Sequence, residues 1–257
     1  WMENIIRPNR AETTVYAYQK IIDNHLDPLL GAVPLSQLSP KQIQEYYQTM
    51  TRTEGLSSNT IRRHHDLLSA ALRMAVRQDM LRVNPMERVE PPRPKLHEAS
   101  YYTQENLKVL YQLVEGHWLE MVVKVTAGLG LRREEICGLK WESVDFQRRV
   151  VHIKEARTAY GATVVQKETK NRSSMRTLFM PDELYELLRR EKARQEQERA
   201  IRGGDYAASG HVVLDREGLP YSPNALSLAF TRFVRKNPLP RLTLHGLRHT
   251  FATIASA

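Results

Sequence analysis

Cysteine and long apolar runs are nearly absent from this sequence. Cys137 is the only cysteine among 257 residues, so no internal disulfide can form and a reducing compartment is expected. The most apolar run, residues 118–131, contains Glu120 and Lys124 and is too short to span a bilayer. No secretory signal is visible at the N-terminus. These absences favour a cytoplasmic enzyme or binding protein.

Acidic residues are outnumbered by basic ones. The chain has 38 Lys and Arg against 29 Asp and Glu, a net charge of +9 and an isoelectric point near 9.7. This balance favours nucleic acid or another anionic surface as the partner. The length is enough for one large domain or two modest ones with a sizeable core.

A proline-rich segment divides the chain. Residues 91–95, P-P-R-P-K, cannot propagate a helix and are predicted to form an extended basic linker. Residues 1–90 have helical periodicity throughout, with helices predicted over residues 14–26, after a capping box that begins at Ser39, and after a cap at Ser58. This pattern predicts a small all-α domain.

Residues 96–257 combine helical and strand-like patterns, which predicts a mixed α+β domain. Helices are expected after a cap at Thr103 and over residues 117–126, 181–202 and 223–236. Strands are expected over residues 149–153, 162–167 and 176–180, with a further short one over residues 211–214. No Walker-type glycine loop occurs in the sequence.

The segment R-L-T-L-H-G-L-R-H-T-F-A-T-I-A-S, residues 241–256, is the most informative part of the chain. His245 and Arg248 stand three apart at the start of an apolar-periodic stretch, so they share one face of the first helical turn. A helix N-terminus favours anions through its free N–H groups and its dipole. An imidazole and a guanidinium at that end therefore predict a phosphate-binding site.

Three separated motifs carry a resemblance to the tyrosine recombinases, the phage integrase family. The H-x-L-R-H-T-F-A-T stretch at residues 245–253 resembles the family signature. The stretch A-G-L-G-L-R-R-E-E-I-C-G-L-K-W at residues 127–141 is similar to the segment of the first catalytic arginine. The stretch T-K-N-R-S-S-M-R-T-L-F-M-P at residues 169–181 is similar to the lysine-bearing segment, with Phe179 replacing the usual proline.

The N-terminal part carries the same resemblance, in its T-x-x-x-Y-x-x-x-I opening at residues 14–22 and its N-P close at residues 84–85. The resemblance is strongest to integrases of conjugative transposons and temperate phages. It implies a SAM-like helical core-binding domain and a mixed α+β catalytic domain, which together form a C-shaped clamp on duplex DNA.

The resemblance also implies the catalytic roles. Arg132 and Arg248 would bind the non-bridging oxygens of a DNA phosphate, which gain charge in the transition state. Lys170 would protonate the departing 5′ oxygen, with Lys167 as its competitor, and His245 would help to deprotonate a tyrosine nucleophile. Glu135 and His249 would support them. Because fixed cations do the work of a metal and a 3′-phosphotyrosine preserves the bond energy, neither a metal nor ATP is expected.

Other basic residues are candidates for DNA contacts. The set consists of Arg62, Arg63, His64, Arg93, Lys95 and Lys140. For Arg62, Arg63 and the His64–His65 pair, an exposed face of the third helix is expected, and phosphate contact and plain solvation both stay open. The implied partners are double-stranded DNA with specific recombination sites, a homotetramer of the full-length protein and DNA-bending accessory proteins, without a membrane. The implied location is the bacterial nucleoid.

The position of the tyrosines departs from the family pattern. The family nucleophile follows the H-x-x-R motif, whereas Tyr221, the last of eleven tyrosines, precedes His245. We therefore expect the chain to be a fragment that ends before the nucleophile, forms no covalent intermediate and assembles weakly. Trp1 stands where an arm-binding domain would end in some family members.

Three other interpretations fit parts of the sequence. His245 and His249 have the i, i+4 spacing of a zinc-protease helix, but Gly246 occupies the position of the required glutamate. A catalytically inert DNA-binding protein on a recombinase fold and a type IB topoisomerase-like enzyme both fit more of the sequence. The core-binding pattern and the short spacing between motifs favour the recombinase.

Overall fold

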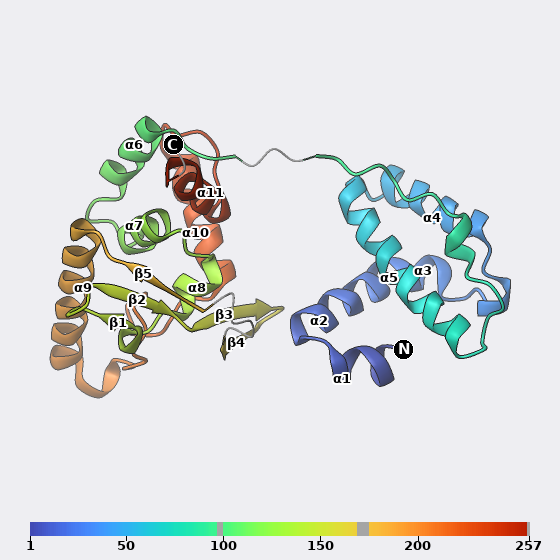
Figure 1. Ribbon diagram of the computed structural model, residues 1–257, viewed down its shortest axis with the longest axis horizontal. Helices are drawn as coiled ribbons and strands as arrows, with labels where there is room; N and C mark the ends of the chain where they lie inside the picture. The colour runs from blue at the N-terminus through green and yellow to red at the C-terminus, as the bar shows by residue number, and fades with distance from the viewer. Residues whose placement is uncertain (97–99, 169–174, 256–257) are drawn as a thin grey trace. The chain divides into compact units, whose positions relative to one another are not determined.

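The computed structural model describes residues 1–96, 100–168 and 175–255. The chain divides into two compact units, Trp1–His97 and Glu98–Ala257 (Figure 1). Each unit has its own hydrophobic core. Among the described residues, no helix has both the length and the apolar character needed to cross a bilayer. Lys170, the predicted general acid, lies outside the described residues.

The first unit is all-helical, as predicted. Its helices are α1 Arg7–Asn9, α2 Glu12–Ile21, α3 Asp27–Leu30, α4 Pro40–Arg52 and α5 Ser58–Arg77. Short π-helical segments lie at Met2–Ile6 and Ile22–Leu26, and 3₁₀ turns at Leu35–Gln37 and Pro85–Arg88. The helix predicted over residues 14–26 is confirmed as α2 and the π-helical turn that continues it.

Serine caps set the starts of the two long helices. The capping box at Ser39 is confirmed, because the Gln42 amide N–H donates to the Ser39 hydroxyl at 3.4 Å and the Ser39 N–H donates to the Gln42 side chain at 2.9 Å. The predicted cap of α5 is wrong by one residue. Ser57 has the extended backbone of a cap and accepts from the Thr60 N–H, so Ser58 is the first helical residue.

His64 is buried, not exposed, which corrects the expectation that it lies on a DNA-facing surface. Its side chain is only 1% exposed, and its Nδ1 is 2.7 Å from the Tyr46 hydroxyl. Its ring also stacks on His25, with centroids 5.0 Å apart. Helical spacing explains the error, because His64 follows the buried Ile61 by three residues and so falls on the same inward face.

The predicted linker segment lies against α5 within the first unit. The Asn59 side chain bonds both backbone groups of Lys95, accepting from its N–H at 3.0 Å and donating to its carbonyl at 2.8 Å. Arg62 donates to the carbonyl of Pro92 at 3.0 Å. The side chains of Arg63, Arg93 and Lys95 are exposed, so the backbone contacts leave these basic groups in solvent.

The second unit combines helices with two small antiparallel sheets. Its helices are α6 Gln104–Val114, α7 Glu120–Leu129, α8 Arg133–Gly138, α9 Asp182–Arg202, α10 Pro223–Lys236 and α11 Leu244–Ala255. The strands β1 Val144–Asp145, β2 Val150–Ile153 and β5 Arg176–Phe179 form one sheet in the order β1-β2-β5, and β3 Glu155–Tyr160 and β4 Thr163–Glu168 form a hairpin. The predicted mixed α+β character is confirmed.

Two strands were not predicted and one prediction was wrong. Strand β3 has the sequence E-A-R-T-A-Y, and every one of its residues is half-buried. It therefore lacks the alternation of apolar and polar residues by which a strand is predicted. Strand β1 has only two residues. Residues 211–214 do not form the expected strand but make two isolated bridges, Lys140 with His211 and Leu214 with Pro220. The cap at Thr103 and helix α10 are confirmed.

Helix α7 lies in the core of the second unit and ends where the chain must reverse. Gly130 has φ +60°, and a side-chain carbon there would approach Phe251 of α11 to 2.4 Å. Glycine is therefore needed twice, for the left-handed turn and for the close packing of α11. Helix α11 is also held by a hydrogen bond from the Tyr102 N–H to the Thr250 hydroxyl at 2.9 Å. These contacts fix α11 beside the turn that follows α7.

The stability of the chain should depend on pH through His64. Burial, and then the charge of His25, lowers its pKa from 6.5 to about 4. Between these values the unfolded state binds more protons, so this contribution is complete above about pH 6.5 and is lost as the pH falls toward 4. We expect chemical denaturation, followed by circular dichroism, to show a loss of roughly 1–3 kcal/mol across this window from His64.

The matched variant is His64→Gln in the whole chain. It should be less stable than the wild type at pH 7 but lose less stability on acidification, because glutamine does not titrate. An identical loss in both proteins would contradict the role of His64.

Candidate active site

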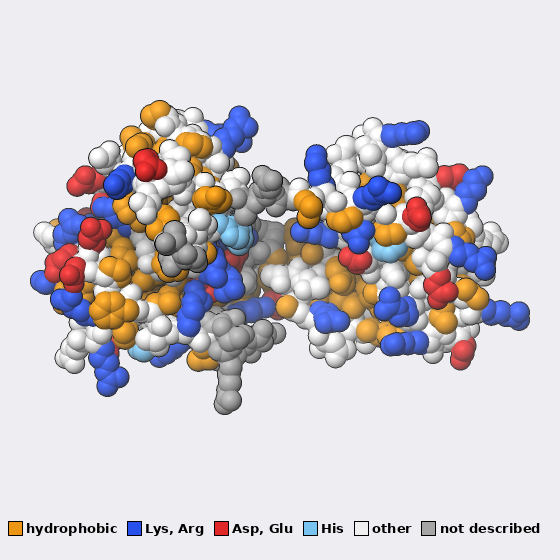
Figure 2. Space-filling view, turned by 45° about the horizontal axis from the view of Figure 1, so that its top comes forward, with side chains coloured by type: hydrophobic (Ala, Val, Ile, Leu, Met, Phe, Trp, Pro, Cys, Tyr) orange, Lys and Arg blue, Asp and Glu red, His pale blue; other side chains and the backbone are white. Residues whose placement is uncertain are grey.

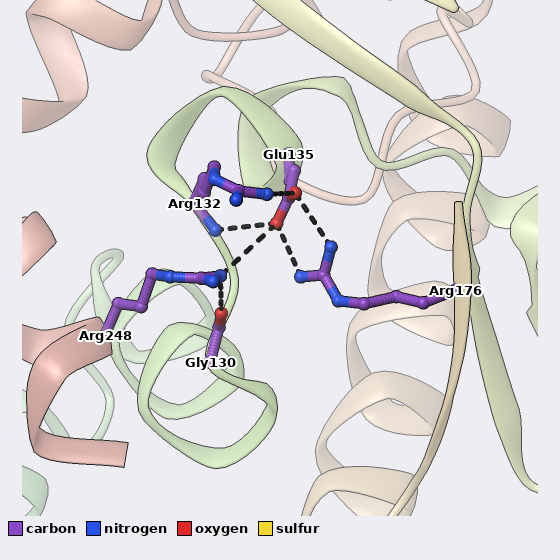
Figure 3. A network of polar contacts seen from close by, with 5 residues as sticks. All are labelled: Gly130, Arg132, Glu135, Arg176 and Arg248. Atoms are coloured by element: carbon purple, nitrogen blue, oxygen red, sulfur yellow. Dashed lines mark hydrogen bonds and ion pairs between the residues drawn. The ribbon is translucent and has the colours of Figure 1, made fainter. Parts of the chain in front are cut away.

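Three arginines surround one buried carboxylate in the second unit (Figure 3). The side chain of Glu135, on α8, is 3% exposed. Arg132 donates to it through its backbone N–H and its Nη1, each at 2.8 Å. Arg176 of β5 donates Nη1 to one oxygen at 2.9 Å and Nη2 to the other at 2.7 Å. Arg248 of α11 places its Nη1 3.9 Å from Oε2 and donates to the Gly130 carbonyl.

Local sequence explains the positions of Arg132 and Glu135. Arg132 is the N-cap of α8, directly after the turn at Gly130, and Glu135 is the third helical residue. A glutamate at this position reaches back to the free N–H of the cap residue, as in a capping box. The same carboxylate then meets the Arg132 guanidinium, so a helix-starting motif also orients a cation.

The electrostatics of the cluster leave positive charge on its open side. Burial raises the pKa of Glu135, but hydrogen bonds from Arg176 and Arg132 outweigh it, and the net effect lowers the pKa below its ordinary value. Glu135 is therefore ionised at neutral pH. The side chains of Arg132 and Arg248 are 48% and 29% exposed. Their Nε and Nη2 groups have no partner within residues 1–96, 100–168 and 175–255, so they are available to an anion.

His245 lies at the same end of α11 and within the field of both arginines. Burial lowers its pKa, and so do the charges of His249, Arg248 and Arg132, while Glu134 acts in the opposite direction. The net lowering favours a neutral imidazole, which can accept a proton. The rings of His245 and His249 are nearly perpendicular, with centroids 4.5 Å apart. Within the part of the chain that the structure describes, no group of three or more His, Cys, Asp or Glu side chains could hold a metal ion.

Gly246, between these two histidines, has a packing role. A side-chain carbon there would lie 2.8 Å from the Ser100 carbonyl oxygen and 2.5 Å from Leu242. Its N–H donates to the Thr243 hydroxyl at 3.1 Å, which caps α11. Glycine thus allows the start of the unit to cross α11 next to His245.

Three other basic residues considered in the sequence analysis, all in the described part of the chain, do not bind Glu135. Arg133 points away and donates to Glu134 and Ser227, as its place one position off the motif suggested. Lys140 pairs with Glu155 at 3.0 Å and with Glu142 at 3.7 Å, so its predicted DNA contact would have to compete with two carboxylates. Lys167 is on strand β4.

Sequence reasoning missed Arg176. Arg176 lies in residues 169–181, the stretch that resembles the family's lysine-bearing segment, and that segment also contains an arginine. This match was the one sequence feature that pointed to Arg176. Its partner could not be read from the sequence, since β5 and α8 meet only in the folded unit.

Two family models match the chain. The model described as "Phage integrase family" matches residues 100–255, and that described as "Phage integrase, N-terminal SAM-like domain" matches residues 1–51. The first alone covers more than half of the chain. The motif resemblance found in the sequence is confirmed.

Curated relatives match along nearly the whole chain. A "Tyrosine recombinase XerC-like" protein of Caldanaerobacter subterraneus subsp. tengcongensis is 26% identical over 98% of this chain and 69% of its own length. The "Transposase from transposon Tn916" of Enterococcus faecalis is 24% identical over 98% of this chain and 64% of its own length. The "Integrase" of Mycobacterium phage L5 is 22% identical, over 98% and 66% respectively.

Solved structures confirm the predicted fold class, a SAM-like helical domain followed by a mixed α+β catalytic domain. The Tn1549 transposon integrase, in complex with transposon right end DNA, superposes with a TM-score of 0.83 at 23% identity, over 97% of this chain and 82% of that one. A lambda integrase dimer bound to a COC′ core site gives 0.67 at 18% identity, over 97% and 66%.

We expect Glu135→Gln to destabilise the chain in a pH-dependent way. At pH 7 the loss should be roughly 1–3 kcal/mol, because the partly exposed arginines around the buried site lose their charged acceptor. The lowered pKa of Glu135 contributes stability above the unfolded pKa, and this contribution disappears as the pH falls through the folded one. The difference from wild type should therefore shrink between pH 7 and an acidic pH below the ordinary range of a glutamate, measured by denaturant unfolding at both.

Glu134→Gln is the matched control, since Glu134 bonds the partly exposed Arg133. It should change stability little at either pH. A loss in Glu135→Gln that is the same at both pH values would show that the carboxylate charge is not what the cluster needs.

Proposed function

This chain belongs to the phage integrase family of tyrosine recombinases, and from that premise we propose that it is a site-specific DNA recombinase. The reaction moves a DNA phosphodiester onto a tyrosine, forming a 3′-phosphotyrosine, and then back onto a DNA hydroxyl. The observation that carries the proposal is the convergence of Arg132 and Arg248 beside Glu135, with N–H groups open to solvent. The family match favours this function over an inert DNA-binding protein or a topoisomerase.

The two outer arginines would supply the phosphate site. Phosphoryl transfer depends mainly on positioning and charge stabilisation. Arg132 and Arg248 would each donate to the non-bridging oxygens, with a planar fork that suits phosphate better than an ammonium does. Glu135 would hold Arg132 in place from behind, through both its backbone and its side chain.

His245 would assist the tyrosine. A phenol has a pKa of about 10, so it needs a proton acceptor at neutral pH. The lowered pKa of His245 keeps its imidazole in the accepting form, and its place at the start of α11 puts it beside Arg248. His249 would pack against its ring edge-to-face and restrict its orientation. None of the residues assigned here is the nucleophile.

Lys170 would protonate the departing 5′ oxygen. This assignment rests on the match of residues 169–181 to the family's lysine segment, and Lys170 lies outside the described residues. Lys167 is the competitor, three residues earlier on β4.

The partner would be duplex DNA carrying specific recombination sites. The integrases of transposon Tn1549 and of lambda are described on DNA, the latter also as a tetramer on a Holliday junction. In this chain the exposed Arg63, Arg93 and Lys95 of the first unit are the residues proposed to contact phosphates. A tetramer, DNA-bending accessory proteins and a place on the nucleoid stay predictions.

Replacing either outer arginine should separate cleavage from binding. In the full-length product of the gene, Arg132→Ala or Arg248→Ala should slow strand cleavage by about 10²-fold or more, since a donor to the transition state is lost. Site binding should persist, with a salt dependence reduced by about one unit, because many other phosphate contacts remain. Covalent adducts on a nicked suicide substrate measure cleavage, and gel shifts at several salt concentrations measure binding.

Arg133→Ala is the matched control. It removes the same charge from the neighbouring position, but its guanidinium bonds Glu134 and Ser227, so cleavage should stay near the wild-type rate. Wild-type cleavage by Arg248→Ala would end the assignment of the phosphate site.

A sulfur substitution should identify the general acid. If Lys170 protonates the leaving oxygen, Lys170→Ala should cleave poorly on normal DNA but well on DNA with sulfur at the 5′-bridging position, because thiolate leaves without a proton. Lys167→Ala should have no defect that sulfur relieves. Rescue of the Lys167 variant instead would move the role three residues upstream.

A further inference from the structure

Arg176 is the one member of the arginine cluster whose side chain meets Glu135 with a bidentate bond. Both of its terminal nitrogens donate, one to each carboxylate oxygen, at 2.9 and 2.7 Å. Its side chain is 25% exposed, less than those of Arg132 and Arg248. In Figure 3 it reaches Glu135 from β5, on the side opposite the other two arginines.

The two oxygens of Glu135 are unequally shared among the three cations. Oε2 accepts from the Arg132 backbone and from Nη2 of Arg176, while Nη1 of Arg248 stays 3.9 Å away and donates to the Gly130 carbonyl. A bidentate arginine–carboxylate pair is the stronger arrangement. Arg176 therefore occupies acceptor capacity that would otherwise draw Arg248 from its 3.9 Å ion pair into a hydrogen bond with Glu135.

The charge balance gives Arg176 a second effect, also through Glu135, whose negative charge it offsets. Three guanidiniums and one carboxylate leave a net charge of +2 on the cluster. Without Arg176 the net charge is +1, and the carboxylate is compensated only by the two outer arginines. Charge on the non-bridging oxygens rises in the transition state, so a cluster that has lost one positive charge stabilises it less.

We propose that Arg176 is a positioning residue for the phosphate site: it satisfies Glu135 from behind and so leaves Arg248 and the outer edge of Arg132 to the phosphate. This role rests on the proposed recombinase function. Arg176 acts through Glu135 and does not touch the DNA.

The test is a double-mutant cycle in the full-length gene product. Single-turnover cleavage of a nicked suicide substrate is measured at saturating protein for Arg176→Met, Glu135→Gln and the double variant. Arg176→Met should slow cleavage about tenfold or more with unchanged site affinity. The double variant keeps two arginines without the carboxylate, a net charge of +2, and should cleave faster than Arg176→Met alone. A residue that only supports the fold predicts a double variant no faster than the single one, and that result would overturn the proposal.

Two further measurements keep the test decisive if Arg176→Met folds poorly. Arg176→Lys restores the charge without the planar fork and should recover part of the rate. Crystal structures of the variants should show a shorter distance between Arg248 Nη1 and Glu135 Oε2, which is 3.9 Å in the wild type. We expect about 2.8 Å in Arg176→Met and a smaller shortening in Arg176→Lys. An unchanged distance in the variant that crystallises counts against the proposal.

Arg248→Ala in the same assay tests the proposed phosphate site separately from the proposed role of Arg176. Wild-type cleavage by Arg248→Ala refutes the phosphate site itself. Loss of cleavage in Arg248→Ala together with wild-type cleavage in Arg176→Met refutes only the positioning role.

Discussion

The second unit is organised around Glu135, the one acidic residue that is buried in the described part of the chain. The Glu135 carboxylate is out of water, and a carboxylate in that position is tolerated only when it is fully hydrogen-bonded. Its hydrogen-bond donors come from the cap of α8 and from β5, and Arg248 of α11 lies 3.9 Å from it, so segments far apart in the sequence must meet around the charge. Because the buried carboxylate needs cationic donors, the arginines of the proposed phosphate site lie around it.

The first unit uses polar groups in a different way. Two tyrosine–histidine pairs join α4 and α5, Tyr46 with the buried His64 and Tyr47 with the half-buried His65. Each pair satisfies two polar groups at once, so the helices pack closely without a buried charge. The basic groups of this unit stay outside, where Asn59 fixes the backbone of Lys95 and leaves the lysine side chain in solvent.

Helix caps, hydrophobic periodicity and motif matches predicted most of the helices and the proposed site residues. Most of the features that they missed depend on long-range contacts. Caps at Ser39 and Thr103, and helix α10, follow from side-chain chemistry within a few residues. His64 was misplaced because its polarity suggested the surface, whereas its helical position and the Tyr46 hydroxyl place it inside. Strand β3 lacks alternation, and the bond from Arg176 to Glu135 joins residues 41 positions apart. Such pairings depend on tertiary structure, which no sequence window contains.

The fastening of α11 has a consequence for biosynthesis. The Tyr102–Thr250 bond joins residues 148 positions apart, and the contact of Arg248 with Gly130 spans 118. Chains fold from the N-terminus as they leave the ribosome, so the helical first unit can fold while the second is still being made. The second unit cannot close until α11 has emerged, and until then Glu135 and Arg132 lack the third element of their site. A nascent chain therefore completes the first unit, with its proposed DNA contacts, before it completes the proposed phosphate site of the second unit.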